Sequence, residues 1–378
     1  MKNTADVLVA GVGGCGASAL YHLARDGHRV IGFDRFEPGH DRGSSHGETR
    51  VIRQAYFEHP DYVPLLRRAY GLWTELEDES QASLMDLCGL LMIGPPGGEI
   101  LGGSRLAAER YGVPVEDITV AECAERFPAF SIPEGSDVLW EPSGGYLKVE
   151  DCVRCYAGLA QKHGATLNTG EFILSFQSTG AGVEVQTNRG KYSADRLVLT
   201  AGAWAPQLLP AVAEAANLHV TRKVLAWYPI QAALPAPTST FFIERPHGSY
   251  YGFPCIDGKT VKLAEHSGGT PLDDPLALDR SLQTMDVHGP GKLIDDVFPS
   301  LSSSPVRHDV CMYTMSDDGH FVIDRDPENE NVVFAAGFSG HGFKFMSAMG
   351  AVMAELAVDG QSTSEIEFLG LERFSNRQ

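Results

Sequence analysis

The stretch ADVLVAGVGGCGASALYHLARDGHRVIGFDRF, residues 5–36, carries the pattern that decides the fold. Its apolar residues predict a buried strand over 6–10, a helix over 17–26 and a second strand over 28–33. A glycine-rich turn joins the first strand to the helix. This order is that of a βαβ unit, so we expect a domain of the Rossmann type that binds a dinucleotide.

Three glycines of the turn have different roles. Gly11 permits the tight turn, Gly13 lets the backbone approach a pyrophosphate, and Gly16 lets the helix pack closely on the strand. The N-terminus of the helix offers free N–H groups to the phosphates. The residues of the turn expected to contact the cofactor are Gly11, Val12, Gly13, Gly14 and Gly16.

An acidic residue ends the second strand. Asp34 lies where a carboxylate accepts hydrogen bonds from the ribose hydroxyls of a dinucleotide. Arg35 follows it and is also expected to contact the cofactor. The loop by itself leaves open whether the dinucleotide is NAD or FAD.

Length and charge limit the other possibilities. A chain of 378 residues with 43% hydrophobic residues favours two domains. Its net charge of −19 argues against binding to nucleic acid or anionic lipid, which relies on clustered Lys and Arg. The longest apolar runs are too short for a membrane helix, and the N-terminal run carries the glycine pattern rather than that of a signal peptide. We expect a soluble, cytoplasmic protein.

The seven cysteines do not form the dense, even framework of a secreted domain. Cys152 and Cys155 form a CxxC pair on a predicted helix over 149–163, without a second pair or a histidine pair at zinc spacing. We expect no metal and no redox role for this pair. A buried free thiol is the ordinary interpretation of Cys311.

Three further stretches are candidates for the binding site. In residues 43–53, Arg50 and Arg53 are three apart at the start of a predicted helix, where they either bind an anion or stay solvated at the surface. A strand over 197–200 ends in the small-residue turn that contains Gly202 and Trp204. A strand over 332–335 leads through Gly340, His341 and Gly342 to a helix from about residue 345.

Eight pieces of the chain together resemble the monomeric sarcosine oxidase and N-methyltryptophan oxidase family of flavoproteins. They follow the family's order over nearly the whole chain: GVGGCG with Asp34, GSSHGETRVIR (43–53), TAGAW (200–204), RKVLAWY (222–228), YYGFP (250–254), KLAEHSGG (262–269), CMYT (311–314) and AGFSGHGFKF (336–345). The segment 230–250 shows the least correspondence, which leaves the size of the accepted side chain open.

The resemblance implies a mixed α/β fold with two domains. Residues 1–85, 146–218 and 306–378 would form a Rossmann-like FAD-binding domain of the p-hydroxybenzoate hydroxylase type. Residues 86–145 and 219–305 would form a substrate domain with a mainly antiparallel sheet. The cofactor would be FAD, attached covalently to Cys311 through a thioether at the 8α carbon of the flavin.

The resemblance also implies roles for individual residues. Arg53 and Lys344 match the pair that binds the substrate carboxylate, and Lys262 matches the lysine that activates oxygen. His266 and Tyr251 match positions above the flavin, where they shape the pocket and tune amine protonation. Besides Lys344 and the residues of the glycine turn, the expected flavin contacts are Ser44, His46, Thr49, Arg50, Gly202, Trp204, Cys311, Met312, Gly340, His341 and Gly342.

The expected reaction is oxidative demethylation of a secondary N-methyl L-amino acid by O₂ and water. A cyclic imino acid such as pipecolate or proline is the alternative substrate. A flavin-binding protein without turnover and a nicotinamide dehydrogenase are the alternatives of another class. We expect a monomer whose partners are a small amino acid and O₂.

Overall fold

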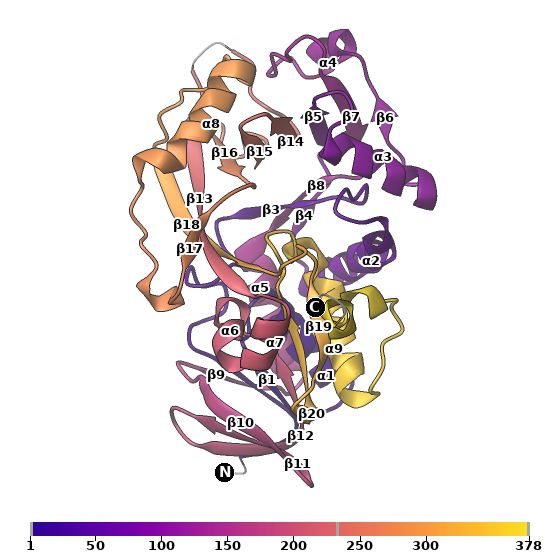
Figure 1. The fold of residues 1–378 in the computed structure, drawn as a ribbon, viewed down its shortest axis with the longest axis vertical. Coiled ribbons are helices and arrows are strands. Elements are labelled where there is room, and N and C mark those ends of the chain that lie inside the picture. The colour runs from indigo at the N-terminus through magenta and orange to yellow at the C-terminus, as the bar shows by residue number, and fades with distance from the viewer. Residues whose placement is uncertain (1–2, 232–233, 376–378) are drawn as a thin grey trace.

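A computed structural model describes residues 3–231 and 234–375. Residues 1–2 and 376–378, at the outer ends of the expected FAD-binding domain, lie outside the described residues, as do 232–233 in the segment of least family correspondence. The described chain forms three sheets (Figure 1). In Figure 1 the largely parallel sheet lies in the lower half and the largest sheet lies in the upper half.

The lower sheet has a parallel core built around the predicted βαβ unit. Its parallel strands are, in spatial order, β9 (Thr166–Thr169), β2 (Val30–Asp34), β1 (Thr4–Ala10), β12 (Lys191–Leu199) and β20 (Asn329–Ala336). Antiparallel strands extend it: β10 (Ile173–Thr179) and β11 (Gly182–Thr187) beside β12, and β19 (Val322–Asp326) beside β20. The predicted strands over 6–10, 28–33, 197–200 and 332–335 are confirmed, with ends shifted by a few residues.

Alternation along β1 explains how this sheet is covered on both faces. Val7 and Val9 pack against a layer of helices, whereas Leu8 and Ala10 pack on the opposite face. The helices are α1 (Gly14–Arg25), α2 (Val63–Ser80), α5 (Val149–Lys162) and α9 (Met346–Val358). The short helices α6 (Ala205–Leu208) and α7 (Pro210–Ala215) contribute to the core of the opposite face. The helices predicted over 17–26, over 149–163 and from about 345 are therefore confirmed.

The largest sheet is antiparallel except for one pair of strands. Its strands are, in spatial order, β17 (Thr270–Leu272), β13 (His219–Pro229), β16 (Thr260–Glu265), β15 (Gly248–Gly252), β14 (Thr240–Arg245), β5 (Leu90–Gly94), β7 (Asp137–Glu141) and β6 (Glu116–Asp117). Strands β14 and β5 are parallel. Strand β18 (Arg307–Met315), which carries Cys311, pairs with β13 along its whole length. The expected mixed α/β fold with a mainly antiparallel second sheet is confirmed, while the domain boundaries stay a prediction.

Smaller elements complete the chain. The third sheet, of β3 (Thr49–Ile52), β8 (Gly145–Lys148) and β4 (Met85–Asp86), lies between the two large sheets in Figure 1. The remaining helices are α3 (Glu99–Tyr111), α4 (Val120–Arg126) and α8 (Thr284–Val297), with short turns η1 (Pro60–Tyr62), η2 (Gly202–Trp204), η3 (Pro275–Ala277), η4 (Phe343–Phe345), η5 (Glu367–Leu369) and η6 (Leu371–Phe374). Within the described ranges, no helix has both the length and the apolar character of a membrane span.

One local prediction is wrong. Arg50 lies in strand β3 and Arg53 follows its end, whereas the sequence predicted the start of a helix. The β-branched Thr49, Val51 and Ile52 favour a strand, and β3 gains its partner from β8, far along the chain. The two arginines are therefore not three residues apart on one side of a helix, as the sequence predicted.

Candidate active site

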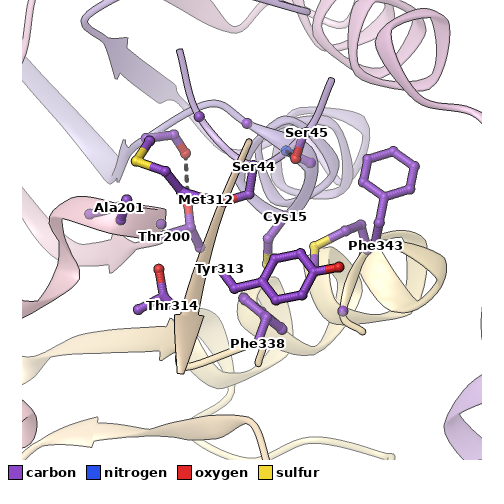
Figure 2. Close-up of a pocket in the computed structure, with 18 of the residues that line it drawn as sticks. Cys15, Ser44, Ser45, Thr200, Ala201, Met312, Tyr313, Thr314, Phe338 and Phe343 are labelled. Carbon is purple, nitrogen blue, oxygen red and sulfur yellow. Dashed lines mark hydrogen bonds between the residues drawn. The ribbon is translucent and has the colours of Figure 1, made fainter. Parts of the chain in front are cut away.

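A long cavity runs from the glycine turn to the largest sheet. Its walls come from distant parts of the chain: the turn after β1, the loop after β2, the end of β12, strand β18 and the segment before α9. Figure 2 shows Ser44 and Ser45 of the loop, Met312, Tyr313 and Thr314 of β18, and Phe338 and Phe343 converging on it. The cavity thus joins the glycine turn to a chamber lined by charged and aromatic residues.

Most of the predicted site residues line this cavity. These are Gly11, Gly13, Gly14, Asp34, Arg35, Ser44, Arg50, Arg53, Gly202, Trp204, Tyr251, His266, Met312, Gly340, His341, Gly342 and Lys344. Six others lie outside the lining: Val12, Gly16, His46, Thr49, Lys262 and Cys311. Of these six, His46, Thr49, Lys262 and Cys311 are buried beside lining residues.

The glycine turn leaves room for a phosphate at one position and packs tightly at another. Apart from Gly13 itself and the residues next to it in the chain, no atom of the described residues lies within 4 Å of a Cβ built on Gly13, at the N-terminus of α1. A Cβ on Gly16 would lie 1.8 Å from the carbonyl oxygen of Gly11. The first turn of α1 contains no acidic residue, and its N-cap, Gly13, has no side chain to satisfy the free N–H groups. These features fit an anionic phosphate group.

This difference gives a matched pair of variants. Gly16→Ala is expected to destabilise the fold by about 3 kcal/mol because its Cβ meets backbone. Gly13→Ala is expected to leave the melting temperature of the apoprotein close to that of wild type and to weaken FAD binding, since its Cβ occupies the space of the phosphates. Thermal melts and titration of apoprotein with FAD measure both effects. Equal changes of melting temperature and of FAD affinity in the two variants would contradict the assignment of Gly13 to phosphate binding.

The part of the cavity expected to hold the ribose is built around Asp34. Its carboxylate accepts hydrogen bonds from the backbone N–H groups of Val12, at 2.7 Å, and Phe36, at 2.8 Å. His40 Nε2 lies 3.7 Å from its Oδ1. Burial raises the pKa of Asp34. Beside it, the Arg35 guanidinium lies 3.5 Å from the centroid of the Phe172 ring, and both side chains line the cavity.

Cys311 lies next to the cavity and below its surface. It is fully buried, between Val310 and Met312 on β18. Its Sγ lies 3.4 Å from Nη2 of Arg50 and 3.5 Å from the carbonyl oxygen of Ser44. Both neighbours, Ser44 in the loop after β2 and Arg50 in β3, line the cavity, so the thiol adjoins the predicted flavin chamber.

Lys262 is a buried cation behind the same loop. Its Nζ donates hydrogen bonds to the carbonyl oxygen of Gly47 and to the carbonyl and hydroxyl oxygens of Thr49. Burial and the nearby Arg50 hold the pKa of Lys262 well below its ordinary value. The three oxygens can accept hydrogen bonds from all three N–H groups of an ammonium, and these bonds favour the protonated form of Lys262.

Arg53 and Lys344 face the chamber together with a carboxylate. Arg53 is 2% exposed, and its Nη2 donates to the two carboxylate oxygens of Glu58 at 2.7 and 2.6 Å. Lys344 Nζ donates to the carbonyl oxygen of His341 at 2.6 Å. Burial and Arg53 lower the pKa of Lys344 to about 7. Burial alone would raise the pKa of Glu58, but Arg53 lowers it to about 2.

Aromatic rings surround the remaining side of the chamber. The His266 ring lies 5.5 Å from Phe242, 6.3 Å from Tyr251 and 5.9 Å from Tyr313, between ring centroids. Burial lowers the pKa of His266 to about 3, so its imidazole is neutral at physiological pH. Burial also lowers the pKa of His341, to about 4, so this imidazole is neutral at physiological pH. Tyr56 OH lies 2.6 Å from its Nδ1, and its Nε2 lies 2.8 Å from the carbonyl oxygen of Gly319.

Some lining residues were not predicted from the sequence. Glu58 follows Arg53 by five residues, but only the folded loop shows that they pair. Tyr313 and Thr314 belong to the quoted CMYT piece, and a Cβ on Gly340 would lie 2.2 Å from the Tyr313 ring. Thr314 Oγ1 is buried without a hydrogen-bond partner among the residues that the structure describes. This orphaned hydroxyl at the cavity wall fits a site that holds a polar ligand.

Comparison with known proteins agrees with this cavity. A family model described as FAD dependent oxidoreductase matches residues 6–356. The chain belongs to the FAD-dependent oxidoreductase family. The prediction of a flavin enzyme is therefore confirmed, because the family is defined by its dependence on FAD.

Relatives in this family match nearly the whole chain. Monomeric sarcosine oxidase from Bacillus sp. (strain B-0618) is 35% identical, over 99% of this chain and 97% of that protein. N-methyl-L-tryptophan oxidase from Yersinia pestis (strain Pestoides F) is 34% identical, over 98% and 99%. The solved structure of NikD, an unusual amino acid oxidase essential for nikkomycin biosynthesis, has a TM-score of 0.85 and 26% identity over 98% of both chains. The predicted family resemblance is confirmed.

The residues present fit FAD. The open position at Gly13, the uncapped helix N-terminus, the buried Asp34 and the orphaned Thr314 hydroxyl lie along one cavity. Together they provide donors for a pyrophosphate and acceptors for a ribose at one end. The other end offers the aromatic chamber in which a flavin ring would lie against Tyr313 and the buried cations.

Proposed function

We propose that this flavoprotein oxidises the CH–NH group of a secondary N-methyl L-amino acid. One O₂ and one water are consumed, and the primary amino acid, formaldehyde and hydrogen peroxide are formed. The observation that carries the proposal is the pair of buried cations Arg53 and Lys344 in the chamber at the flavin end of the cavity. Relatives named as oxidases of sarcosine and N-methyl-L-tryptophan support it.

The cations would bind and orient the substrate carboxylate. Both lie on the wall of one chamber, and each is at least 95% buried, so their charge is little screened by water. Because Arg53 already binds Glu58, the carboxylate of the substrate would share the guanidinium with a resident carboxylate. Lys344 has no carboxylate hydrogen-bonded to its Nζ among the described residues. Its pKa of about 7 leaves it partly protonated at neutral pH, and a bound substrate carboxylate would favour the protonated form that supplies the second charge.

The neutral imidazole of His266 suits a substrate amine that must lose its proton before C–H cleavage. With a pKa of about 3 it can accept a hydrogen bond from the amine but does not add positive charge beside it. The rings of Phe242, Tyr251 and Tyr313 lie around it on the apolar side of the chamber. When bound, FAD supplies the acceptor of the two electrons and returns them to O₂. Lys262, held by the 47–49 loop, would provide positive charge for the oxygen half of the reaction.

Cys311 would hold FAD covalently. The protein as purified is expected to keep its yellow colour in the pellet after acid precipitation, whereas Cys311→Ala is expected to release all of its FAD into the supernatant. Cys255→Ala is the control, because Cys255 is partly buried against the core of the largest sheet and lies outside the cavity. Complete loss of flavin from the wild-type protein on precipitation would contradict covalent attachment.

An anaerobic reduction screen tests the proposed function. The purified protein is mixed with sarcosine, N-methyl-L-tryptophan, pipecolate and proline, and bleaching of the flavin band at about 450 nm is followed. One of the N-methyl compounds is expected to reduce the flavin and, in air, to release formaldehyde. Reduction only by pipecolate or proline, without formaldehyde, would replace the proposal by a cyclic imino acid oxidase. No reduction by any amine would indicate a flavin-binding protein without turnover.

We also propose that the enzyme acts as a cytoplasmic monomer. Its acidic charge and free cysteines support a reducing compartment. One relative is itself named a monomeric enzyme. Size-exclusion chromatography with light scattering measures the state of the holoenzyme directly.

A further inference from the structure

Lys223 is a buried cation that none of the predicted roles uses. It lies on β13, is 5% exposed, and pairs directly with Cys311 of β18 across the sheet. Its Nζ donates hydrogen bonds to the carbonyl oxygens of His266, Ser267 and Gly268 at 2.9, 2.6 and 3.0 Å. All three protons of the ammonium group are thus directed at one turn of the backbone.

This turn carries His266 into the chamber. It begins where β16 ends, and the His266 N–H donates to the carbonyl oxygen of Ser249 at 2.7 Å. The turn also wraps around the lysine stem, because a Cβ on Gly269, where φ is +125°, would lie 3.1 Å from Cδ of Lys223. The side chain of Lys223 therefore contacts the turn along its length, with the ammonium at the end.

The same ammonium also lies close to a second residue that lines the chamber. Lys223 Nζ lies 5.0 Å from the centroid of the Tyr313 ring, within the range of a cation–π interaction. The His266 and Tyr313 rings are 5.9 Å apart and both line the cavity. One buried side chain thus contacts both the turn that carries His266 and the Tyr313 ring of β18.

Burial of an ammonium group costs free energy that an apolar side chain would avoid. For Lys223 this cost appears as a pKa lowered to about 8. The carbonyl contacts offset this cost only while the turn keeps its shape. We propose that Lys223 is a positioning residue, which fixes His266 and Tyr313 in the substrate chamber. The catalytic part of this proposal rests on the proposed function for the role of His266.

Lys223→Met removes the ammonium donors and keeps an unbranched apolar side chain as far as Cε. The limiting rate of anaerobic flavin reduction by the substrate is expected to fall about tenfold, because a small displacement of an oriented group is costly. The dissociation constant of (methylthio)acetate, in which sulfur replaces the amine nitrogen of sarcosine, is expected to stay within about twofold, since Arg53 and Lys344 are untouched. The control is Arg222→Met, which removes the next buried cation of β13, paired with Asp286 instead of the turn. Arg222→Met is expected to lower the melting temperature, but not to slow flavin reduction selectively while the affinity for (methylthio)acetate stays the same.

A double variant decides whether Lys223 acts through His266. If it does, His266→Ala slows reduction in the wild-type background and has little further effect in the Lys223→Met background. Equal effects in both backgrounds, or an unchanged rate in Lys223→Met, would overturn the proposal.

Hydrogen exchange separates this proposal from the proposed function, because it needs no substrate. Backbone amides of residues 266–269 are expected to exchange at least about tenfold faster in Lys223→Met than in wild type and Arg222→Met. If no amine reduces the wild-type flavin, this measurement still tests the positioning of the turn. Unchanged protection there would overturn the role of Lys223 in holding it.

Discussion

Lys262→Met is expected to slow the reaction of the reduced enzyme with O₂ by about 10²- to 10³-fold, the effect typical of removing one preorganised electrostatic group. The Lys262 ammonium is held by the carbonyl oxygens of Gly47 and Thr49 and by the Thr49 hydroxyl, so its position is fixed before oxygen arrives. Anaerobic reduction by the substrate is expected to change by less than about threefold, because other residues bind the carboxylate. Stopped-flow measurement of the two half-reactions separates these effects.

The control for this variant is Lys259→Met. Lys259 lies just before the same strand but is exposed, so both half-reactions are expected to keep their wild-type rates. Melting temperatures of both variants show whether the loss of the buried hydrogen bonds also loosens the 47–49 loop. If Lys262→Met slows both half-reactions equally, Lys262 acts on substrate oxidation and the assignment to oxygen is wrong.

Arg53→Met is expected to destabilise the fold by about 3–5 kcal/mol, because it leaves Glu58 buried without its partner. The pair is nearly inaccessible to solvent, with 3% of the arginine side chain and 12% of the glutamate side chain exposed. The double variant Arg53→Met with Glu58→Gln removes both charges and is expected to regain most of the free energy of unfolding. Urea unfolding measures these differences.

Substrate binding separates the two roles of this arginine. In both the single and the double variant, affinity for the amino acid is expected to fall by about 2–5 kcal/mol, since the partner of the carboxylate is absent in each. Arg105→Met is the control: its ion pairs with Asp117 and Asp137 reach solvent, with 33% or more of each side chain exposed, so the variant is expected to cost about 0–1 kcal/mol of stability and no affinity. If the double variant regained substrate affinity together with stability, Arg53 would be a structural residue only.

The nucleotide-binding part of the fold was predictable because its signal is local. Gly16 is required by the approach of the Gly11 carbonyl oxygen, a contact that arises within the βαβ unit itself. The same holds for the helix over 149–162, whose apolar spacing shows one buried face. The prediction of a helix at Arg50 failed because β3 is set by pairing with residues 145–148, which local spacing does not reveal.

The sequence by itself determined the βαβ unit, the family and the types of residue available for chemistry. Glycine spacing and the order of the motifs can be read directly along the chain. Only the tertiary structure decided which groups the charged side chains contact. It placed Glu58 on Arg53, set Lys262 against the 47–49 loop, and directed Lys223 at the turn that carries His266. These contacts depend on strand pairing between distant segments and on burial, which sets the strength and pKa of each charge.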